Sequence, residues 1–365
     1  MKRISNGNLA KLVAFFLVIG TLTCTVAYAV SGSSYDPLDP SLNQPSDNTP
    51  PQNSNNKDDN ETITTLKPIP EYLHTITGLE ITREQSYLLP LCFIFSSKTE
   101  VYSISSSYLT LEIPIEKGDT RFICFTDDAL SMGKIGAILP ARKNFLPIIS
   151  SFGGILISYG DDGRIDFPTN TSPTSINLKE NTGYYYTEYN DFYYTNSDLL
   201  RALLKNTDTS TVTTEKTIIP YSFNAFYDSQ ILGSSSAKEI LIKYCDNNST
   251  SFNYSIDTNR YVVSKNYTVI TDPLNDKCSS YDNVFVLYAN STIYESSDFT
   301  ECVLDTTAGG TGIYASRGTV KQISWEFTEG KLTFKDETGS QLIVNRGSSF
   351  ISYVKTSERP SVSIS

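Results

Sequence analysis

The first 66 residues constrain this 365-residue chain more than any other stretch. Basic residues precede an apolar run, Leu12 to Val30, that carries no charge. A basic start followed by such a run is the pattern of a secretory signal or an N-terminal anchor. Residues 31–66 are rich in Ser, Pro, Asn and Asp, and burying their few large apolar side chains cannot offset the entropy of ordering. We therefore predict a leader at 1–30, a disordered stalk, and a globular body held outside a membrane.

The leader has two equally supported fates. Ala27-Tyr28-Ala29 is an A-x-A site, and cleavage after Ala29 would give a secreted body. The apolar run is also close to the roughly 20 residues that cross a bilayer, so an uncleaved anchor is the alternative. Basic residues before the run would then place the body on the outer face of the membrane. Cys24 offers a weaker third fate, lipidation, because Thr23 is larger than a lipidation site prefers before its cysteine.

Charge and composition limit the class of partner. The chain has 29 basic and 40 acidic residues, and this net charge of −11 repels phosphate backbones, which argues against a nucleic-acid partner. Its 24 tyrosines, together with many Thr, Ser, Val and Ile, favour β-structure and amphipathic surfaces. We expect a cell-wall polymer or an envelope protein as partner, and the oligomeric state is left open.

The cysteines and the single histidine argue against a metal site. No two of the cysteines beyond the leader form a C-x-x-C pair, and His74 is the only histidine, so we expect no metal and no cofactor. Cys92 and Cys124 lie inside apolar strands, where a buried free thiol is expected. Cys278 and Cys302 lie in polar segments and could form a disulfide, although free thiols are favoured.

The first half of the body has the pattern of an α/β domain, which we place at residues 67–205. Its expected strands are 87–95, 108–113, 121–125 and 154–160. Apolar residues at helical spacing predict a helix over 143–152, ended by Gly153-Gly154. A strand, a helix and a strand within about forty residues indicate an αβ unit on a mixed sheet with flanking helices.

The second half is expected to be almost entirely β-structure. After a helix at 199–205 capped by Asn196, Ser197 and Asp198, we predict a crossing segment at 206–236 and a β-rich domain at 237–356. Turn residues at 257–259 and 336–339 indicate hairpins, the second between 331–334 and 341–344. The last residues, 357–365, are expected to form a disordered tail. The predicted fold class is α+β.

Read in order, these segments resemble the YerB-like lipoproteins, domain-of-unknown-function family 3048. The resemblance runs from residue 77 to about 354 and implies an N-terminal α/β part followed by a C-terminal β part. The segments that carry it are Glu116 to Phe122, Lys134 to Arg142, Tyr159-Gly160, Asp282 to Val286, Asp305 to Gly312, Ile323-Ser324-Trp325, Phe334, Asp336, Gly339 and Gly347.

The sequence departs from the family pattern at polar positions. Leu139 stands where the family has an arginine, and Asn190-Asp191-Phe192 stand where it has Pro-His-Asn. Any chemistry that the family performs with those polar groups is therefore in doubt for this chain.

The candidate ligand-binding residues are Arg121, Arg142, Lys143, Asp127 and Asp128. Two guanidiniums and an ammonium could hold a carboxylate or a phosphate. Asp127 and Asp128 follow an apolar strand, at the end where α/β sheets often place ligands. The alternatives are a structural ion pair between Arg121 and Glu116 or Asp119, and a solvated turn at the two aspartates.

Other motifs are weaker. The aromatic stretch 184–194 could stack on sugar rings or serve as edge packing, and 161–166 faintly resembles a calcium loop without its spacing. The turn at 305–312 is a poor phosphate cradle, because β-structure follows it. We expect no serine triad, because the only histidine, His74, lies at the end of the body that adjoins the stalk.

These expectations favour a non-catalytic binding or assembly protein of the bacterial cell envelope. The alternative is an enzyme on wall polymers or their phosphorylated precursors, in which Arg121 and Arg142 hold an anion and Asp127 or Asp128 acts as base.

Overall fold

A computed structural model describes residues 71–88, 90–160, 175–188, 191–207, 220–225, 229–295 and 300–365. The predicted leader and stalk, the calcium-like loop at 161–166 and most of the first half of the crossing segment lie outside these residues. Within the described ranges, no helix is long and apolar enough to span a membrane. Lys67–Ser365 form one compact unit.

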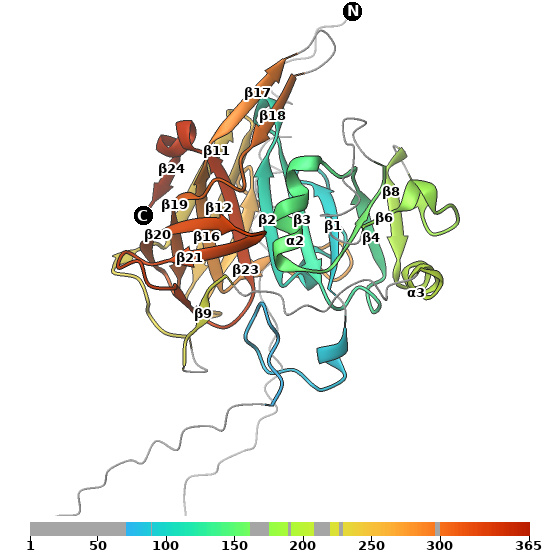
Figure 1. The fold of residues 1–365 in the computed structure, drawn as a ribbon, viewed down its shortest axis with the longest axis horizontal. Helices are drawn as coiled ribbons and strands as arrows, with labels where there is room; N and C mark the ends of the chain where they lie inside the picture. The colour runs from blue at the N-terminus through green and yellow to red at the C-terminus, as the bar shows by residue number, and fades with distance from the viewer. Residues whose placement is uncertain are drawn as a thin grey trace, which may run out of the picture. The chain divides into compact units, whose positions relative to one another are not determined.

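In the described residues, 14 strands form one large sheet (Figure 1). In spatial order they are β10 (Ser235–Ser236), β20 (Thr319–Thr328), β19 (Gly310–Ser316), β16 (Asn283–Ala289), β23 (Ser349–Lys355), β2 (Leu109–Pro114), β3 (Thr120–Thr126), β1 (Leu91–Ser96), β4 (Lys134–Ile138), β8 (Tyr193–Asn196) and β7 (Tyr186–Thr187). β21 (Lys331–Lys335) adds to β20, whereas β5 (Ile155–Ser158) pairs with β1 and with β6 (Ser175–Asn177).

A second sheet of 6 strands and two strand pairs complete the β-structure of the described residues. The second sheet contains β14 (Thr268–Val269), β13 (Arg260–Lys265), β12 (Asn248–Ser255), β11 (Glu239–Cys245), β24 (Val362–Ile364) and β15 (Ser280–Tyr281). The pairs are β17 (Ser291–Glu295) with β18 (Thr300–Leu304) and β22 (Ile343–Val344) with β9 (Ser222–Phe223). The helices are α2 (Leu146–Phe152), α3 (Ser197–Asn206) and the 3-10 turns η1 (Gln85–Tyr87), η2 (Ile104–Ser106), η3 (Glu116–Gly118), η4 (Lys143–Phe145), η5 (Leu178–Glu180) and η7 (Thr356–Ser361).

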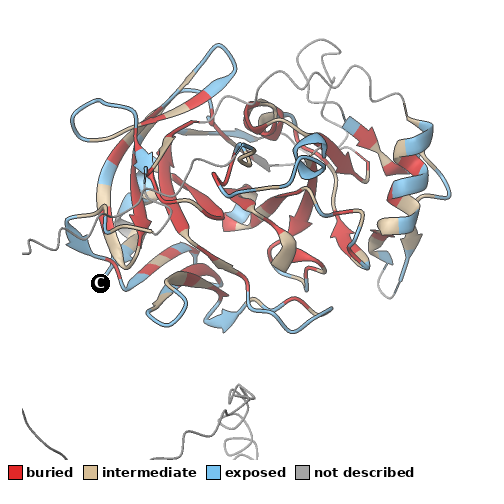
Figure 2. Cartoon of the chain, turned by 90° about the horizontal axis from the view of Figure 1, so that it is seen from below, coloured by how far each residue is buried: buried red, intermediate tan, exposed pale blue. Residues whose placement is uncertain are grey.

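The central strands bury both faces, as their continuous apolar runs require. On one face Phe122 of β3 packs with Phe252 and Val263 of the second sheet. On the other face Phe125 of β3 packs with Phe152 of α2, which lies across the sheet in Figure 1. Along these strands burial is nearly continuous (Figure 2).

The two predicted halves share one sheet. β2 from the first half pairs in parallel with β23 from the second, with Leu109 opposite Ser349 and Leu111 opposite Ile351. The boundary predicted near residue 206 therefore does not separate two compact bodies. The pairing of β2 with β23 joins the strands of both halves into one sheet, and neither strand is left as an exposed edge.

Several local predictions are confirmed. The helix expected over 143–152 is η4 followed by α2, and Gly153 ends it with φ 73°. Asn196 caps α3, since its side chain accepts a hydrogen bond from the Leu199 amide. The hairpin around 257–259 is the β12–β13 pair. Cys92 and Cys124 are buried free thiols, and Cys278 and Cys302 are also free.

One local prediction is wrong. Residues 357–365 are not a disordered tail, because β24 extends the second sheet by pairing with Ile240–Ile242. This distant strand offers backbone partners that a local pattern does not reveal.

The hairpin predicted between 331–334 and 341–344 is confirmed. Lys335 and Gln341 form an antiparallel bridge across the turn at Asp336, and the Leu342 amide donates to the Phe334 carbonyl at 2.9 Å. β21 also pairs with β20, and β22 pairs with β9. Within the predicted crossing segment, β10 adds to the large sheet beside β20 and β9 forms a two-stranded pair with β22.

Candidate functional site

Arg142 forms a structural ion pair with Glu116. It is buried at the start of η4, and its two terminal nitrogens donate to the Glu116 carboxylate at 2.6 and 2.7 Å. This bidentate contact with Arg142 is the main cause that lowers the pKa of Glu116. Arg142 therefore meets a carboxylate of its own chain, where the prediction expected a ligand anion.

Arg121 lies near the same carboxylate without bonding to it. Burial, followed by the charge of Arg142, lowers the pKa of Arg121, whereas Glu116 and Asp119 oppose that shift. Among the described residues, Arg121 makes no side-chain hydrogen bond or ion pair, and Lys143 is exposed and likewise unpaired. The structure thus brings the two arginines together, but around Glu116.

The two aspartates lie elsewhere. Arg121 is near the start of β3 and Asp127 follows its end, so about 20 Å of strand separates them. Asp127 and Asp128 therefore cannot act as a base on an anion held by Arg121, as the enzyme alternative requires. Asp128 is exposed and accepts a hydrogen bond from Ser131, as in the solvated-turn alternative.

Asp127 instead holds the only histidine. His74 Nε2 donates to Asp127 Oδ2 at 2.7 Å, while Nδ1 accepts from the backbone amides of Ile76 and Thr77 at 3.2 and 3.1 Å. The ring also packs edge-on against Tyr108. Because both ring nitrogens have partners, His74 fixes the entry of the chain into the fold and has no atom left for a substrate.

The Glu116–Arg142 contact predicts a pH-dependent contribution to stability. A carboxyl whose folded pKa is lowered stabilises the fold at neutral pH and loses that contribution as the pH falls through the folded pKa. Arg142→Lys removes the bidentate contact, so it should lower the urea midpoint at about pH 7 and much less at about pH 3. Lys143→Gln, one residue away, should change neither midpoint. An equal loss for Arg142→Lys at both pH values would contradict this account.

A different region has the features of a ligand site. A cavity of about 220 Å³ lies where β4, β5 and β8 meet, and we call it the tyrosine cavity. Its lining residues are Ile138, Leu139, Pro140, Tyr159, Gly160, Lys179, Asp191, Phe192 and Tyr193.

The strand alternation of β8 aims its tyrosines to opposite faces. Tyr193 points to the cavity side and stacks on Tyr159, with ring centroids 3.3 Å apart, and Tyr185 packs edge-on against both. Tyr194 points the other way, where its ring and that of Tyr102 each lie 4.0 Å from the Lys134 ammonium. The aromatic stretch thus divides into a structural cation–π group and a cavity wall.

The polar groups of the tyrosine cavity are available to a ligand. In the described part of the chain, the Lys179 and Asp191 side chains make no hydrogen bond or ion pair. The Gly160 amide, by contrast, is fixed, since it donates to Asn177 Oδ1 at 2.7 Å. Within the described residues, the cavity therefore combines aromatic surface with one ammonium and one carboxylate whose side chains have no partner. Among the described residues, no three metal-ligating side chains cluster.

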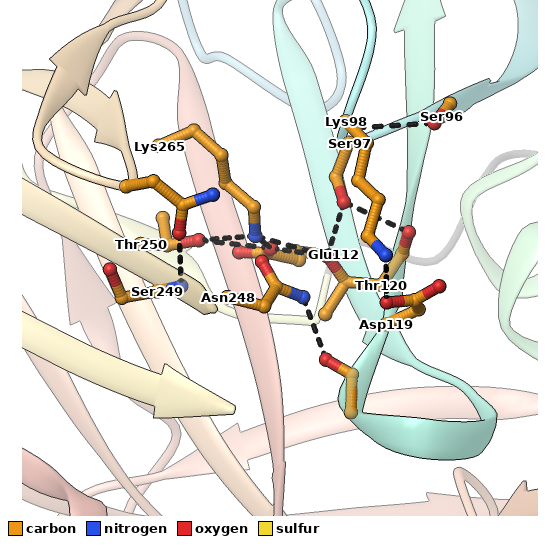
Figure 3. Close-up of polar contacts among 12 residues, drawn as sticks. Ser96, Ser97, Lys98, Glu112, Asp119, Thr120, Asn248, Ser249, Thr250 and Lys265 are labelled. Carbon is orange, nitrogen blue, oxygen red and sulfur yellow. Dashed lines mark hydrogen bonds and ion pairs between the residues drawn. The ribbon is translucent and has the colours of Figure 1, made fainter. Parts of the chain in front are cut away.

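A fully buried polar cluster, the Glu112 cluster, joins the two sheets (Figure 3). Glu112 Oε1 of β2 accepts from Lys265 Nζ of β13 at 2.5 Å. Thr120 and Thr250 hydroxyls also donate to this oxygen, at 2.8 and 2.9 Å. Glu112 Oε2 is buried without a partner.

Sequence reasoning missed the tyrosine cavity as a site. Leu139, Tyr159-Gly160 and Asp191-Phe192 were singled out separately, as departures from or matches to the family pattern, and the structure places all of them around this one cavity. Their common location was the missing signal, because β4, β5 and β8 meet only in the folded sheet. The Glu112 cluster was missed for a similar reason, since its residues come from four strands.

Comparisons with known proteins agree with the predicted resemblance. Residues 240–351 match the family described as "Protein of unknown function (DUF3048) C-terminal domain". The fold is similar to the crystal structure of YerB protein from Bacillus subtilis, with a TM-score of 0.68 and 18% identity over 81% of this chain and 100% of that chain. No curated protein matches the sequence.

Proposed function

Because the chain carries a DUF3048 C-terminal domain in a YerB-like fold, we propose that it is a non-catalytic binding protein of the bacterial cell envelope. The body lies outside the membrane, tethered through the apolar segment 12–30 and the stalk, or is secreted if the leader is cleaved after Ala29. Its binding site is the tyrosine cavity, and its ligand is a sugar ring of a wall polymer.

The observation that carries this proposal is the composition of the cavity wall. Sugar rings have one apolar face, which packs on aromatic rings such as Tyr193 and Phe192. Their hydroxyls need hydrogen-bond partners, which the free side chains of Asp191 and Lys179 offer. A volume of about 220 Å³ is below the roughly 300–1,000 Å³ of pockets for drug-sized ligands, which suits one ring.

The fixed geometry elsewhere favours binding over catalysis. An enzyme built on the arginines needs a base beside them, but Asp127 and Asp128 lie at the other end of β3. Arg142 is held by Glu116 and His74 by Asp127, so neither is poised for a substrate. In the described part of the chain, these candidate residues therefore do not form the arrangement that the enzyme alternative requires.

Removing one wall of the cavity should weaken sugar binding. Tyr193→Ala deletes a stacking surface and should lower the affinity for wall-derived oligosaccharides about 10-fold, since an aromatic contact contributes about 0.5–1.5 kcal/mol beyond its buried area. Tyr193→Phe keeps the ring and should bind nearly as the unaltered protein does. Isothermal titration calorimetry measures both.

Tyr267→Ala is the matched control, because Tyr267 is 74% exposed in the turn between β13 and β14 and does not line the tyrosine cavity. Binding that is equal in Tyr193→Ala and Tyr267→Ala would exclude the tyrosine cavity as the site. No binding of any wall oligosaccharide by the unaltered protein would overturn the proposed function itself.

A further inference from the structure

The Glu112 cluster holds a buried amine against a buried carboxyl group. Lys265 and Glu112 are separated by 153 residues, and their side chains are only 9% and 0% exposed. Lys265 Nζ lies 5.8 and 5.1 Å from the ring centroids of Phe122 and Tyr244. Two sheets thus hold the amine and the carboxyl group of an amide condensation within hydrogen-bond distance.

Amide formation requires the uncharged forms of both groups, and the direct contact between Nζ and the carboxyl group gives a path for the proton that must move. An ion pair in a low-dielectric interior is costly, and transfer of one proton from Nζ to the carboxylate removes both charges. The products are a neutral amine, which is nucleophilic, and a carboxylic acid, whose carbon is electrophilic. Fixed contact between reactants replaces a bimolecular step and can correspond to effective molarities of about 10⁵ M or more.

We propose that Lys265 and Glu112 form an intramolecular isopeptide bond that covalently joins β13 to β2. The Lys265 Nζ lone pair attacks Glu112 Cδ, and a C–N bond forms as the Cδ–Oε2 bond breaks. The second Nζ proton passes to Oε2 during the attack. The first Nζ proton, accepted by Oε1, then moves to Oε2 as well, so that Oε2 leaves as water and Oε1 becomes the amide oxygen. One amine and one carboxylic acid therefore give one amide and one water molecule, and no oxidant or cofactor is needed.

The partners of the two carboxyl oxygens fit this direction of reaction. Oε1 accepts from Thr120 and Thr250, and these donors would hold it as the amide oxygen. Oε2, the oxygen that leaves, is the one without a hydrogen-bond partner. Tyr244 lies near Glu112, and burial, followed by the Glu112 charge, raises the pKa of Tyr244 well above its ordinary value. Its protonated hydroxyl can donate to the departing oxygen.

Tryptic peptide mapping of the full-length protein tests the bond directly. A linked protein should yield residues 99–117 joined to residues 261–277, lighter than the two separate peptides by one water molecule. Trypsin should also fail to cut after Lys265, because an acylated lysine is not recognised. The denatured chain, closed into a loop of 153 residues, should migrate faster in a denaturing gel.

Lys265→Arg is the matched control, since it keeps the positive charge but replaces the nucleophilic amine. It should give residues 99–117 as a free peptide, with cleavage at position 265 restored, and abolish the difference in gel mobility. Recovery of residues 99–117 as an unmodified peptide from the folded, unaltered protein, with cleavage after Lys265, would overturn the proposal. The pair would then be an ordinary buried salt bridge.

Discussion

Phe350→Ala should destabilise the whole body by about 3–5 kcal/mol in a single unfolding transition. Phe350 is fully buried on β23, the strand through which the second half of the chain pairs with the first. Its ring contacts Phe122, Phe252 and Tyr281 edge-on, at centroid distances of 6.0, 5.0 and 5.2 Å. Removing it leaves a cavity between the two sheets that rigid strands cannot fill.

Chemical denaturation followed by circular dichroism and tryptophan fluorescence measures this effect. The only tryptophan, Trp325, is in the second half, whereas circular dichroism reports both halves. Both probes should therefore shift together. Tyr267→Ala, an exposed position, should change the free energy of unfolding by less than about 0.5 kcal/mol. Two separated transitions would show that the halves are independent domains.

Asp272→Ala should cost about 3 kcal/mol of stability, because a buried carboxylate makes four contacts that alanine cannot replace. Oδ1 accepts from the amides of Ser103 and Leu274 at 3.1 and 3.0 Å. Oδ2 accepts from the amide and the hydroxyl of Ser105 at 3.1 and 2.7 Å. This side chain therefore ties the loop before β15 to η2 of the first half.

Thermal unfolding of Asp272→Ala and Asp272→Asn gives the size of this contribution. The asparagine variant should also lose stability, because its amide group would face backbone N–H donors in place of an acceptor. Asp246→Ala, an exposed carboxylate, serves as the control and should be nearly neutral. An Asp272→Asn variant as stable as the unaltered protein would contradict the assigned contacts.

Short sequence patterns correctly predicted the strands and helices that depend only on neighbouring residues. The run Cys92–Phe95 is apolar at every position and became a strand buried on both faces. The spacing of Phe145, Ile149 and Phe152 gave the helix, and Asn196 gave the start of α3. These features depend on the side-chain period and on capping, both of which can be read from a short window.

Pairings between distant segments could not be predicted in this way. An apolar pattern shows that a strand is buried but does not identify its neighbour, so the β2–β23 pairing was missed. The contact between Lys265 and Glu112 likewise depends on how the second sheet packs against the first, because 153 residues separate the two side chains along the chain. The ion pair between Arg142 and Glu116 could not be predicted for the same reason, because the two residues come together only in the folded chain.

The central claim is that the tyrosine cavity binds a sugar ring, and saturation-transfer-difference NMR tests it most directly. The full-length protein in detergent is mixed with disaccharides released from the cell wall. The account predicts saturation of protons on one face of a single ring, because one face stacks on Tyr193 or Phe192. That signal should disappear in Tyr193→Ala and persist in Tyr267→Ala. An absent signal with the unaltered protein, or an equal signal in both variants, would contradict the account.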